Sequence, residues 1–195
     1  MVARFVCPAS RLAELNGEDL HLSVVVDAPA DGLQLDERVE AVEGVGDPDG
    51  LVGLAPEAYV EVSSADQVSE IAAAGTRAKI RCGPEPPPIE ALAGFVRACR
   101  SAGVPFKATA GLHHAVRSDG QHGFLNLLAA AVFGDEEQAL AEDDPGAFGL
   151  GATFSWRDRE ADPEQVEQVR RALFASIGSC SFTEPVDELK GLGLL

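Results

Sequence analysis

The segment AYVEVSSADQVSEIAAAGTRAKIRC, residues 58–82, decides the fold because it reads as strand, helix and strand in turn. Its first and last stretches, residues 58–63 and 77–82, alternate apolar and polar side chains with the period of a strand. Between them a helical pattern opens at Ser64, a candidate N-cap, and closes at Gly75, a typical helix stop. A βαβ unit of this kind predicts parallel strands joined by a right-handed crossover.

The same pattern extends from this unit in both directions. Further strands are expected at residues 3–7, 20–28 and 105–112, and further helices at residues 35–44 and 86–103. Beyond Leu112 the alternation weakens. There we expect helices at residues 123–134 and 162–178, a surface helix plus a turn at residues 136–148, short strands at residues 152–156 and 179–182, and a terminal helix from Glu184. These elements predict a single α/β domain, residues 1–195, built around a parallel sheet.

Side-chain direction in the expected strands favours a barrel over a flat sheet. Successive side chains of a strand point to opposite faces, so Glu61, Lys79 and Lys107 share a polar face. Val60 and Ile80 share the apolar face. A flat parallel sheet covered by helices would be apolar on both faces. In a (β/α) barrel, helices cover the apolar outer face and the polar face lines the interior. The alternative is a half-solvated sheet whose charged face lies in water.

The chain is short for a complete barrel. An eight-stranded barrel usually needs at least about 200 residues, and the pattern here contains five to seven strands. We therefore expect a barrel or barrel-like fold that is incomplete, distorted or completed by a second copy in a homo-oligomer. A strand placed almost at Met1 also indicates that the chain begins late relative to a longer relative.

Lysine is rare in this chain, and its placement is unusual. Two of the three lysines, Lys79 and Lys107, fall in strand interiors, whereas Lys190 lies near the C-terminus. Burial and neighbouring cations can lower the pKa of a lysine, which then becomes a nucleophile for carbonyl groups or a general base. The alternative is that each lysine is a structural ion-pair partner of Glu61 or Asp27.

The carboxyl ends of the expected strands gather groups that can carry chemistry. Cationic side chains concentrate there in a very acidic protein, which favours a small anionic substrate, a carboxylate or a phosphate. The candidate catalytic residues are Lys107, Lys79, Glu61, Asp27 and His113. The candidate substrate-binding residues are Arg81, Thr109, His114, Arg117, His122 and Asn126.

A metal site is the rival interpretation. His113, His114 and His122 lie within ten residues, and imidazoles with a carboxylate suit zinc or another divalent ion. Adjacent histidines point in different directions on an extended backbone, however, and no HxH or HExxH spacing is present. A metal-dependent hydrolase or lyase using these histidines therefore stays open as an alternative. A third alternative is a non-catalytic protein that binds a ligand or a subunit.

The motif GSCSF, residues 178–182, is compact and rich in small residues. Backbone N–H groups of such a segment can form an anion-binding nest. Cys180 could act as a nucleophile, although no base is adjacent to it in the sequence. Close packing of a last strand is the alternative interpretation.

Composition excludes several classes of protein. The net charge of −17, from 32 acidic and 15 basic residues, disfavours nucleic acid as a partner. No apolar run approaches the roughly 18 residues that span a membrane, and no secretory signal opens the chain. The four cysteines lie far apart without a CxxC pair, which predicts reduced thiols in a cytoplasmic protein. No motif predicts a cofactor.

The stretches PFKATAGLHHAVR, HGFLN and GSCSF, with EPV after the last, resemble a group of bacterial proteins whose activity is uncharacterised. This resemblance spans roughly the second half of the chain and implies no established activity. More loosely, a charged inner face with a strand lysine is similar to the class I aldolases, barrel enzymes that use lysine on carbonyl substrates. That likeness is one of architecture and residue type, and it implies an aldolase- or lyase-like reaction.

Overall fold

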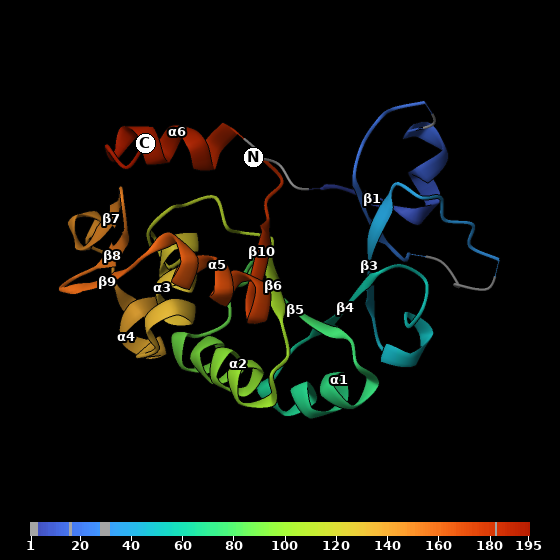
Figure 1. The fold of residues 1–195 in the computed structure, drawn as a ribbon, viewed down its shortest axis with the longest axis horizontal. Coiled ribbons are helices and arrows are strands. Elements are labelled where there is room, and N and C mark those ends of the chain that lie inside the picture. The colour runs from blue at the N-terminus through green and yellow to red at the C-terminus, as the bar shows by residue number, and fades with distance from the viewer. Residues whose placement is uncertain (1–3, 16, 28–31, 182) are drawn as a thin grey trace.

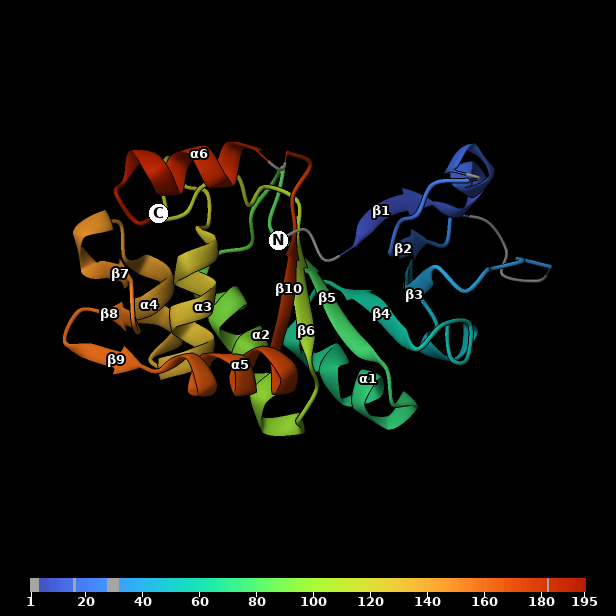
Figure 2. The ribbon, with the colours of Figure 1, turned by 45° about the horizontal axis from the view of Figure 1, so that its top comes forward.

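The centre of the molecule is a seven-stranded parallel sheet that curls into a half-barrel (Figures 1 and 2). The computed structural model describes residues 4–15, 17–27, 32–181 and 183–195. In spatial order the strands are β1 (Phe5–Pro8), β2 (Leu22–Val25), β3 (Val39–Val45), β4 (Glu57–Val62), β5 (Arg77–Arg81), β6 (Phe106–Thr109) and β10 (Phe174–Gly178). The predicted α/β class, with an incomplete parallel barrel, is confirmed.

Helices α1 (Val68–Ala74) and α2 (Ile89–Ala102) cover the outer face of the sheet (Figure 1). Each ends at a glycine in the left-handed region, Gly75 with φ 69° and Gly103 with φ 65°, a conformation that costs glycine little. The apolar side chains of the strands lie beneath these helices, as strand alternation predicts. Phe106, for example, packs edge-on against Phe95 of α2 with ring centroids 5.1 Å apart.

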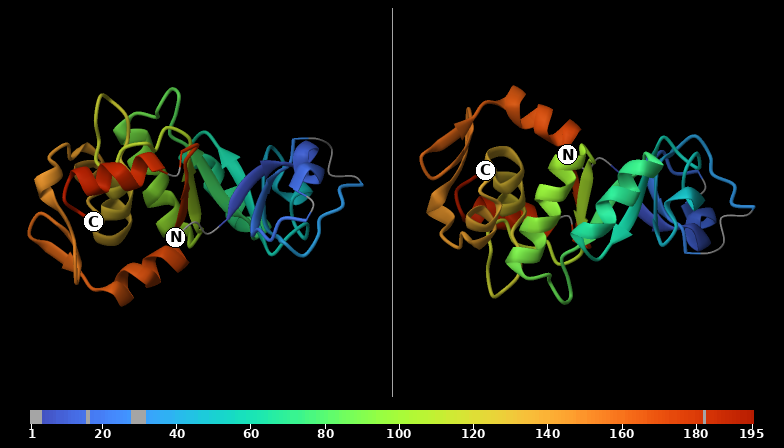
Figure 3. Two further views of the ribbon diagram at one scale, coloured as in Figure 1. Left: turned by 90° about the horizontal axis from the view of Figure 1, so that it is seen from above. Right: turned by 90° about the horizontal axis from the view of Figure 1, so that it is seen from below.

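The chain between β6 and β10 packs against helix α2 and strand β10. It contains α3 (Phe124–Phe133), α4 (Glu136–Ala141), a small antiparallel sheet of β7 (Phe148–Leu150), β8 (Phe154–Trp156) and β9 (Arg159–Ala161), and α5 (Pro163–Ala172). A terminal helix, α6 (Thr183–Gly191), follows β10. Seen from above, the small sheet lies at one end of an elongated molecule and β1 to β3 at the other (Figure 3).

The first three strands are covered less than the rest. Short 3-10 segments take the place of crossover helices here: η1 (Ala9–Leu15) and η2 (Pro48–Gly50), with η3 (Ala65–Gln67) and η4 (Pro145–Ala147) further along. Phe5 and Val6 of β1 are exposed. Within the described part of the chain, β1 pairs with β2 alone and β10 with β6 alone, so the half-barrel has two open edges. None of the described helices has the length and apolar character needed to cross a bilayer.

The predicted helix at residues 35–44 is wrong, because this segment contains β3. In the pairing of β2 with β3, Leu22 and Ser23 oppose Val39 and Ala41, so Glu40 is an extra, bulged residue. The bulge places Val39 and Val42 on one face although they are three residues apart, which imitates the spacing of a helix.

The predictions at residues 162–178 and 179–182 are also corrected. The helix ends at Ala172, and the last strand of the sheet is β10 rather than the segment after it. A second bulge, at Ala175, keeps Ile177 on the apolar face, since Ser176 pairs with Lys107. Residues 179–181 are not strand. Ala3, Ala28 and Phe182, at the ends of predicted strands, lie outside the described residues.

Candidate functional site

Two lysines and a glutamate form an ionic cluster on the inner face of the half-barrel. Lys79 on β5 and Lys107 on β6 are directly opposite in the parallel register. Their Nζ atoms converge on Glu43 of β3, at 2.5 Å from Lys107 to Oε1 and 3.4 Å from Lys79 to Oε2. We call Glu43, Lys79 and Lys107 the lysine cluster. The prediction that the two lysines share a face is confirmed.

Burial makes this cluster chemically unusual. The Glu43 side chain is 2% exposed and each lysine side chain 6% exposed. Burial lowers the pKa of Lys107, the neighbouring Lys79 lowers it further, and the opposing pull of Glu43 does not restore it. Burial also acts to raise the pKa of Glu43, but its ion pairs with the lysines and the hydroxyl of Ser23 outweigh this and hold that pKa below its ordinary value.

A second polar layer lies beneath the cluster, towards the amino ends of the strands. The Tyr59 ring faces the Lys107 ammonium, with Nζ 5.1 Å from the ring centroid, a favourable cation–π distance. The Tyr59 hydroxyl donates to Glu57 at 3.0 Å, and Glu57 also accepts from Arg4 and Arg77. Burial raises the pKa of Tyr59 to about 12, so this phenol stays protonated and uncharged at neutral pH.

The cluster opens to solvent on the side of the strand carboxyl ends. Glu61 contacts Lys79 at 3.0 Å and is 22% exposed, and Arg81, with Nε 4.0 Å from Glu61, is 51% exposed. Glu61 also lines a hollow of about 240 Å³ with Ser63 and Gln67. Among the described residues, the buried Thr109 hydroxyl has no hydrogen-bond partner. Exposure therefore rises from the cluster through Glu61 to Arg81, and the hollow reaches Glu61 but neither lysine of the cluster.

Asp27 does not join this cluster through any contact of the described residues. Its carboxylate instead accepts from the Ser10 backbone N–H at 3.0 Å and the Ser10 hydroxyl at 2.5 Å. These bonds from η1 lower the pKa of Asp27. Asp27 thus ties the first loop of the chain to the end of β2.

The remaining predicted residues lie in the segment after β6. Asn126 is fully buried, with its amide donating to the carbonyls of Ala139 and Glu142 and accepting from the Arg117 backbone N–H. Through these hydrogen bonds, the Asn126 side chain joins α3 to the neighbouring segments of the chain. The geometry does not bring Asn126 to the lysine cluster.

The three clustered histidines have separate partners. His113 Nδ1 lies 2.8 Å from Glu184, and His114 Nδ1 lies 3.0 Å from Glu188. His122 is buried, with Nε2 2.7 Å from the Pro87 carbonyl, and burial lowers its pKa. Among the described residues, no three His, Cys, Asp or Glu side chains are grouped to hold a metal ion. The arrangement therefore lends the metal alternative no support.

Sequence reasoning missed Glu43, the central carboxylate of the cluster, along with its neighbours Ser23 and Tyr59. The Ser23 hydroxyl donates to Glu43 at 2.7 Å. The available signal was the β-branched composition of VEAVEGV, residues 39–45, which is more typical of a strand than of a helix. A strand there would have put a glutamate in the sheet, although its place two strands away from Lys79 depends on the strand order.

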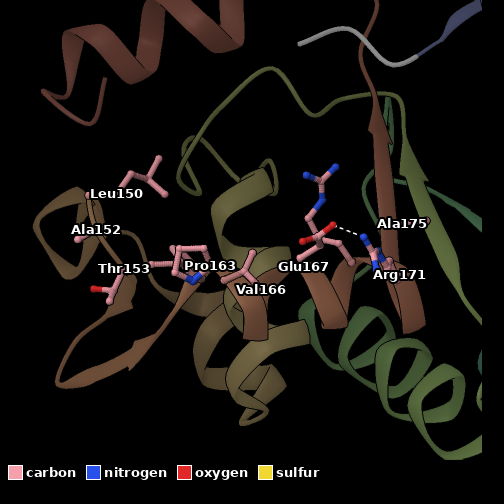
Figure 4. Close-up of a pocket in the computed structure, with 11 residues that line it drawn as sticks. Leu150, Ala152, Thr153, Pro163, Val166, Glu167, Arg171 and Ala175 are labelled. Atoms are coloured by element: carbon pink, nitrogen blue, oxygen red, sulfur yellow. Dashed lines mark hydrogen bonds and ion pairs between the residues drawn. The ribbon is translucent and has the colours of Figure 1, made fainter.

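A larger hollow, of about 550 Å³, lies away from the strand mouth, between α5 and the small sheet (Figure 4). Its apolar lining includes Leu150, Phe154 and Val166. At its rim Arg171 is already paired with Glu167. The candidate residues of the sequence analysis all lie outside this hollow.

Comparison with models of protein families, with curated proteins and with solved structures finds no match for this chain. The resemblances drawn from the sequence motifs therefore stay predictions, and a function has to be argued from the geometry of the sites.

Proposed function

We propose that this protein is a lyase- or aldolase-like enzyme that forms a Schiff base between Lys107 and a small carbonyl compound that carries a carboxylate or a phosphate. The observation that carries the proposal is the buried lysine cluster, in which a second lysine and a glutamate lie against the Lys107 amine. Nearly unexposed charges are costly unless they are paired. A fold that holds three of them together on one inner face fits a catalytic use.

Each neighbour of Lys107 has a chemical role in such a reaction. Glu43 is within hydrogen-bond distance to accept a proton from the Lys107 ammonium, which frees the amine to attack a carbonyl carbon. The carbinolamine then loses its hydroxyl as water, with a proton returned by Glu43 or supplied by Lys79. Ammonium and carbonyl compound thus become an iminium cation and one water molecule. The Tyr59 ring face would stabilise that cation as it does the ammonium.

The groups between the lysine cluster and the solvent would select the substrate. Arg81 is exposed at the mouth and can bind a carboxylate or a phosphate. The unpartnered Thr109 hydroxyl has almost no exposed surface, so it can donate to the same ligand only after the side chains that cover it move.

Reductive trapping tests the proposal. Native protein is incubated with pyruvate and sodium borohydride, and the modified lysine is located by peptide mass mapping. We expect an adduct at Lys107, none at the same position in Lys107→Met, and an unchanged low level at the exposed Lys190. Arg81→Ala should raise the pyruvate concentration needed for half-maximal trapping about tenfold, because it removes a charge-assisted contact.

The controls separate chemistry from damage to the fold. Lys190→Met tests whether any exposed lysine explains the adduct, and circular dichroism of each variant checks its folding. Trapping at Lys107 no faster than at Lys190 would overturn the proposal and leave the lysines as structural ion-pair partners of Glu43 and Glu61. A non-catalytic role in binding a ligand or a subunit would then be the better interpretation of the open half-barrel.

A further inference from the structure

A second set of reactive groups lies outside the lysine cluster, where the chain leaves β6 and β10. Cys180 Sγ is 3.5 Å from His113 Nε2, and the other ring nitrogen of His113, Nδ1, is 2.8 Å from Glu184 Oε2. The sulfur is also 4.0 Å from Nδ1, so it lies beside the imidazole ring, and the three side chains form a cluster of thiol, imidazole and carboxylate. We call Cys180, His113 and Glu184 the thiol triad.

The backbone brings these residues together from distant parts of the sequence. Ala110 and Gly111 have φ values of 59° and 66°, so the chain turns sharply after β6 before it reaches His113. Alanine in the left-handed region is unusual, and such strain is enriched at functional sites. Gly178, at the end of β10, packs closely on Thr109, where an added Cβ would lie 3.0 Å from Cγ2. The segments that carry His113 and Cys180 therefore leave neighbouring strands side by side.

Helix α6 supplies the third member of the triad. Glu184 lies in its first turn, and the Glu184 backbone N–H donates to the Ser181 hydroxyl at 3.2 Å. This bond holds the start of the helix next to Cys180. The helix thus positions the carboxylate beside His113.

The sequence of contacts matches the logic of an activated nucleophile. A carboxylate on Nδ1 fixes the imidazole, and rotation of the Cys180 side chain into line with Nε2 would let that nitrogen take the thiol proton, as in nucleophile, base and orienter triads on unrelated folds. Cys180 is also the exposed member of the four cysteines, since Cys7, Cys82 and Cys99 are buried. A reagent or substrate in solution can therefore reach it.

We propose that the thiol triad is a nucleophilic site for transfer or hydrolysis of a small activated acyl group, with an ester or thioester as substrate. His113 takes the proton of Cys180, the sulfur attacks the acyl carbon, and the bond to the leaving group breaks as His113 returns the proton to it. The products are an S-acyl cysteine and a free alcohol or thiol. Water, with His113 again as base, then releases the acid and restores the thiol. Glu184 acts as a positioning residue.

Local charge narrows the substrate class. Glu184, Asp187 and Glu188 all lie on α6, and Glu188 contacts the neighbouring His114. A substrate with a carboxylate on its acyl group would be repelled by these side chains. The site therefore suits a neutral acyl group, in contrast with the anionic compound proposed for the lysine cluster, and the two proposals stand independently.

Alkylation measures the reactivity of the thiol. Native protein is treated with iodoacetamide from pH 5.5 to 9, and modification of Cys180 is followed by mass spectrometry. At pH 6.5 an ordinary thiol is about 99% protonated, so we expect His113→Ala to slow alkylation on the order of tenfold or more. Glu184→Gln should move the rise of the rate profile to higher pH, and Glu184→Asp should partly restore it.

His21→Ala is the matched control, because His21 pairs with Glu40 at 2.6 Å in the same manner but lies on the approach to β2. In this variant Cys180 should be alkylated at the same rate as in the wild type. Equal alkylation rates at Cys180 in wild type and His113→Ala would overturn the proposal.

Acyl transfer is tested with p-nitrophenyl acetate. We expect a burst of about one nitrophenolate per chain, with acetyl found on Cys180, and no burst in Cys180→Ser or His113→Ala. The hemisuccinate ester of p-nitrophenol should react more slowly because of its charge. Absence of acetyl at Cys180 would overturn the assignment of an acyl substrate, and equal rates for the two esters would overturn its expected neutrality.

Discussion

The lysine cluster and the thiol triad both draw on β6 or the segment that follows it, but they differ in their exposure to water. In the cluster the Lys107 and Glu43 side chains are 6% and 2% exposed, whereas in the triad the His113 and Glu184 side chains are 32% and 60% exposed. Buried charges must be compensated by the fold that encloses them, but exposed charges are compensated largely by water. Substitutions in the lysine cluster should therefore change the free energy of unfolding strongly, whereas substitutions in the thiol triad should change it little.

The largest expected effect is at the centre of the cluster. Glu43→Gln removes the charge that pairs with both lysines, and breaking one side of a buried ion pair typically costs about 3–5 kcal/mol. The equivalent change in the triad, Glu184→Gln, should alter the free energy of unfolding by less than about 0.5 kcal/mol. Urea denaturation of both variants measures the difference. Similar losses in the two variants would contradict the contrast between the sites.

A smaller effect is expected from pH. The pKa of Glu43 is held below its ordinary value of 4.5 in the folded protein, so below that pH the unfolded chain binds more protons than the folded one. The stabilising contribution of Glu43 is thus complete above pH 4.5 and is lost as pH falls through its lowered pKa. We expect the stability gap between wild type and Glu43→Gln to narrow on acidification, because a protonated Glu43 resembles glutamine.

Denaturation curves at several pH values between 7 and 3 would measure this gap. Other carboxylates, such as Glu57, also have a lowered pKa, but they titrate in both proteins and cancel in the comparison. A gap that stays constant down to the lowest pH would show that Glu43 contributes through shape rather than charge.

The two sites also differ in how far the sequence could predict them. Alternation placed Lys79 and Lys107 on one face because β5 and β6 pair in unbroken register. It failed at Glu43, since the bulge at Glu40 gave β3 the apolar spacing of a helix. A bulge depends on pairing with another strand, and no repeating pattern of residues in the sequence marks its position.

The thiol triad could not be assembled from sequence at all. His113 and Cys180 are 67 positions apart, in segments without a periodic pattern, and their approach depends on the pairing of β6 with β10. That pairing was itself hidden, because the residues of β10 were assigned to the end of the preceding helix. Strand interiors are thus predictable from local periodicity, whereas contacts between loops follow from the order of strands in the sheet.

The smallest expected effect concerns Thr109, which lies at the outer edge of the buried region. Its hydroxyl is buried and, within the described residues, unpartnered, whereas the buried hydroxyl of Thr76 donates to the Ile71 carbonyl at 3.4 Å. Removing an unsatisfied hydroxyl relieves a desolvation penalty, so Thr109→Val should raise the free energy of unfolding by about 1 kcal/mol. Thr76→Val breaks a bond and should lower it by a similar amount. If Thr109 is kept for a ligand, Thr109→Val should also weaken trapping of pyruvate at Lys107. A more stable protein with unchanged trapping would remove Thr109 from the substrate path, and a less stable one would mean that its hydroxyl bonds to water.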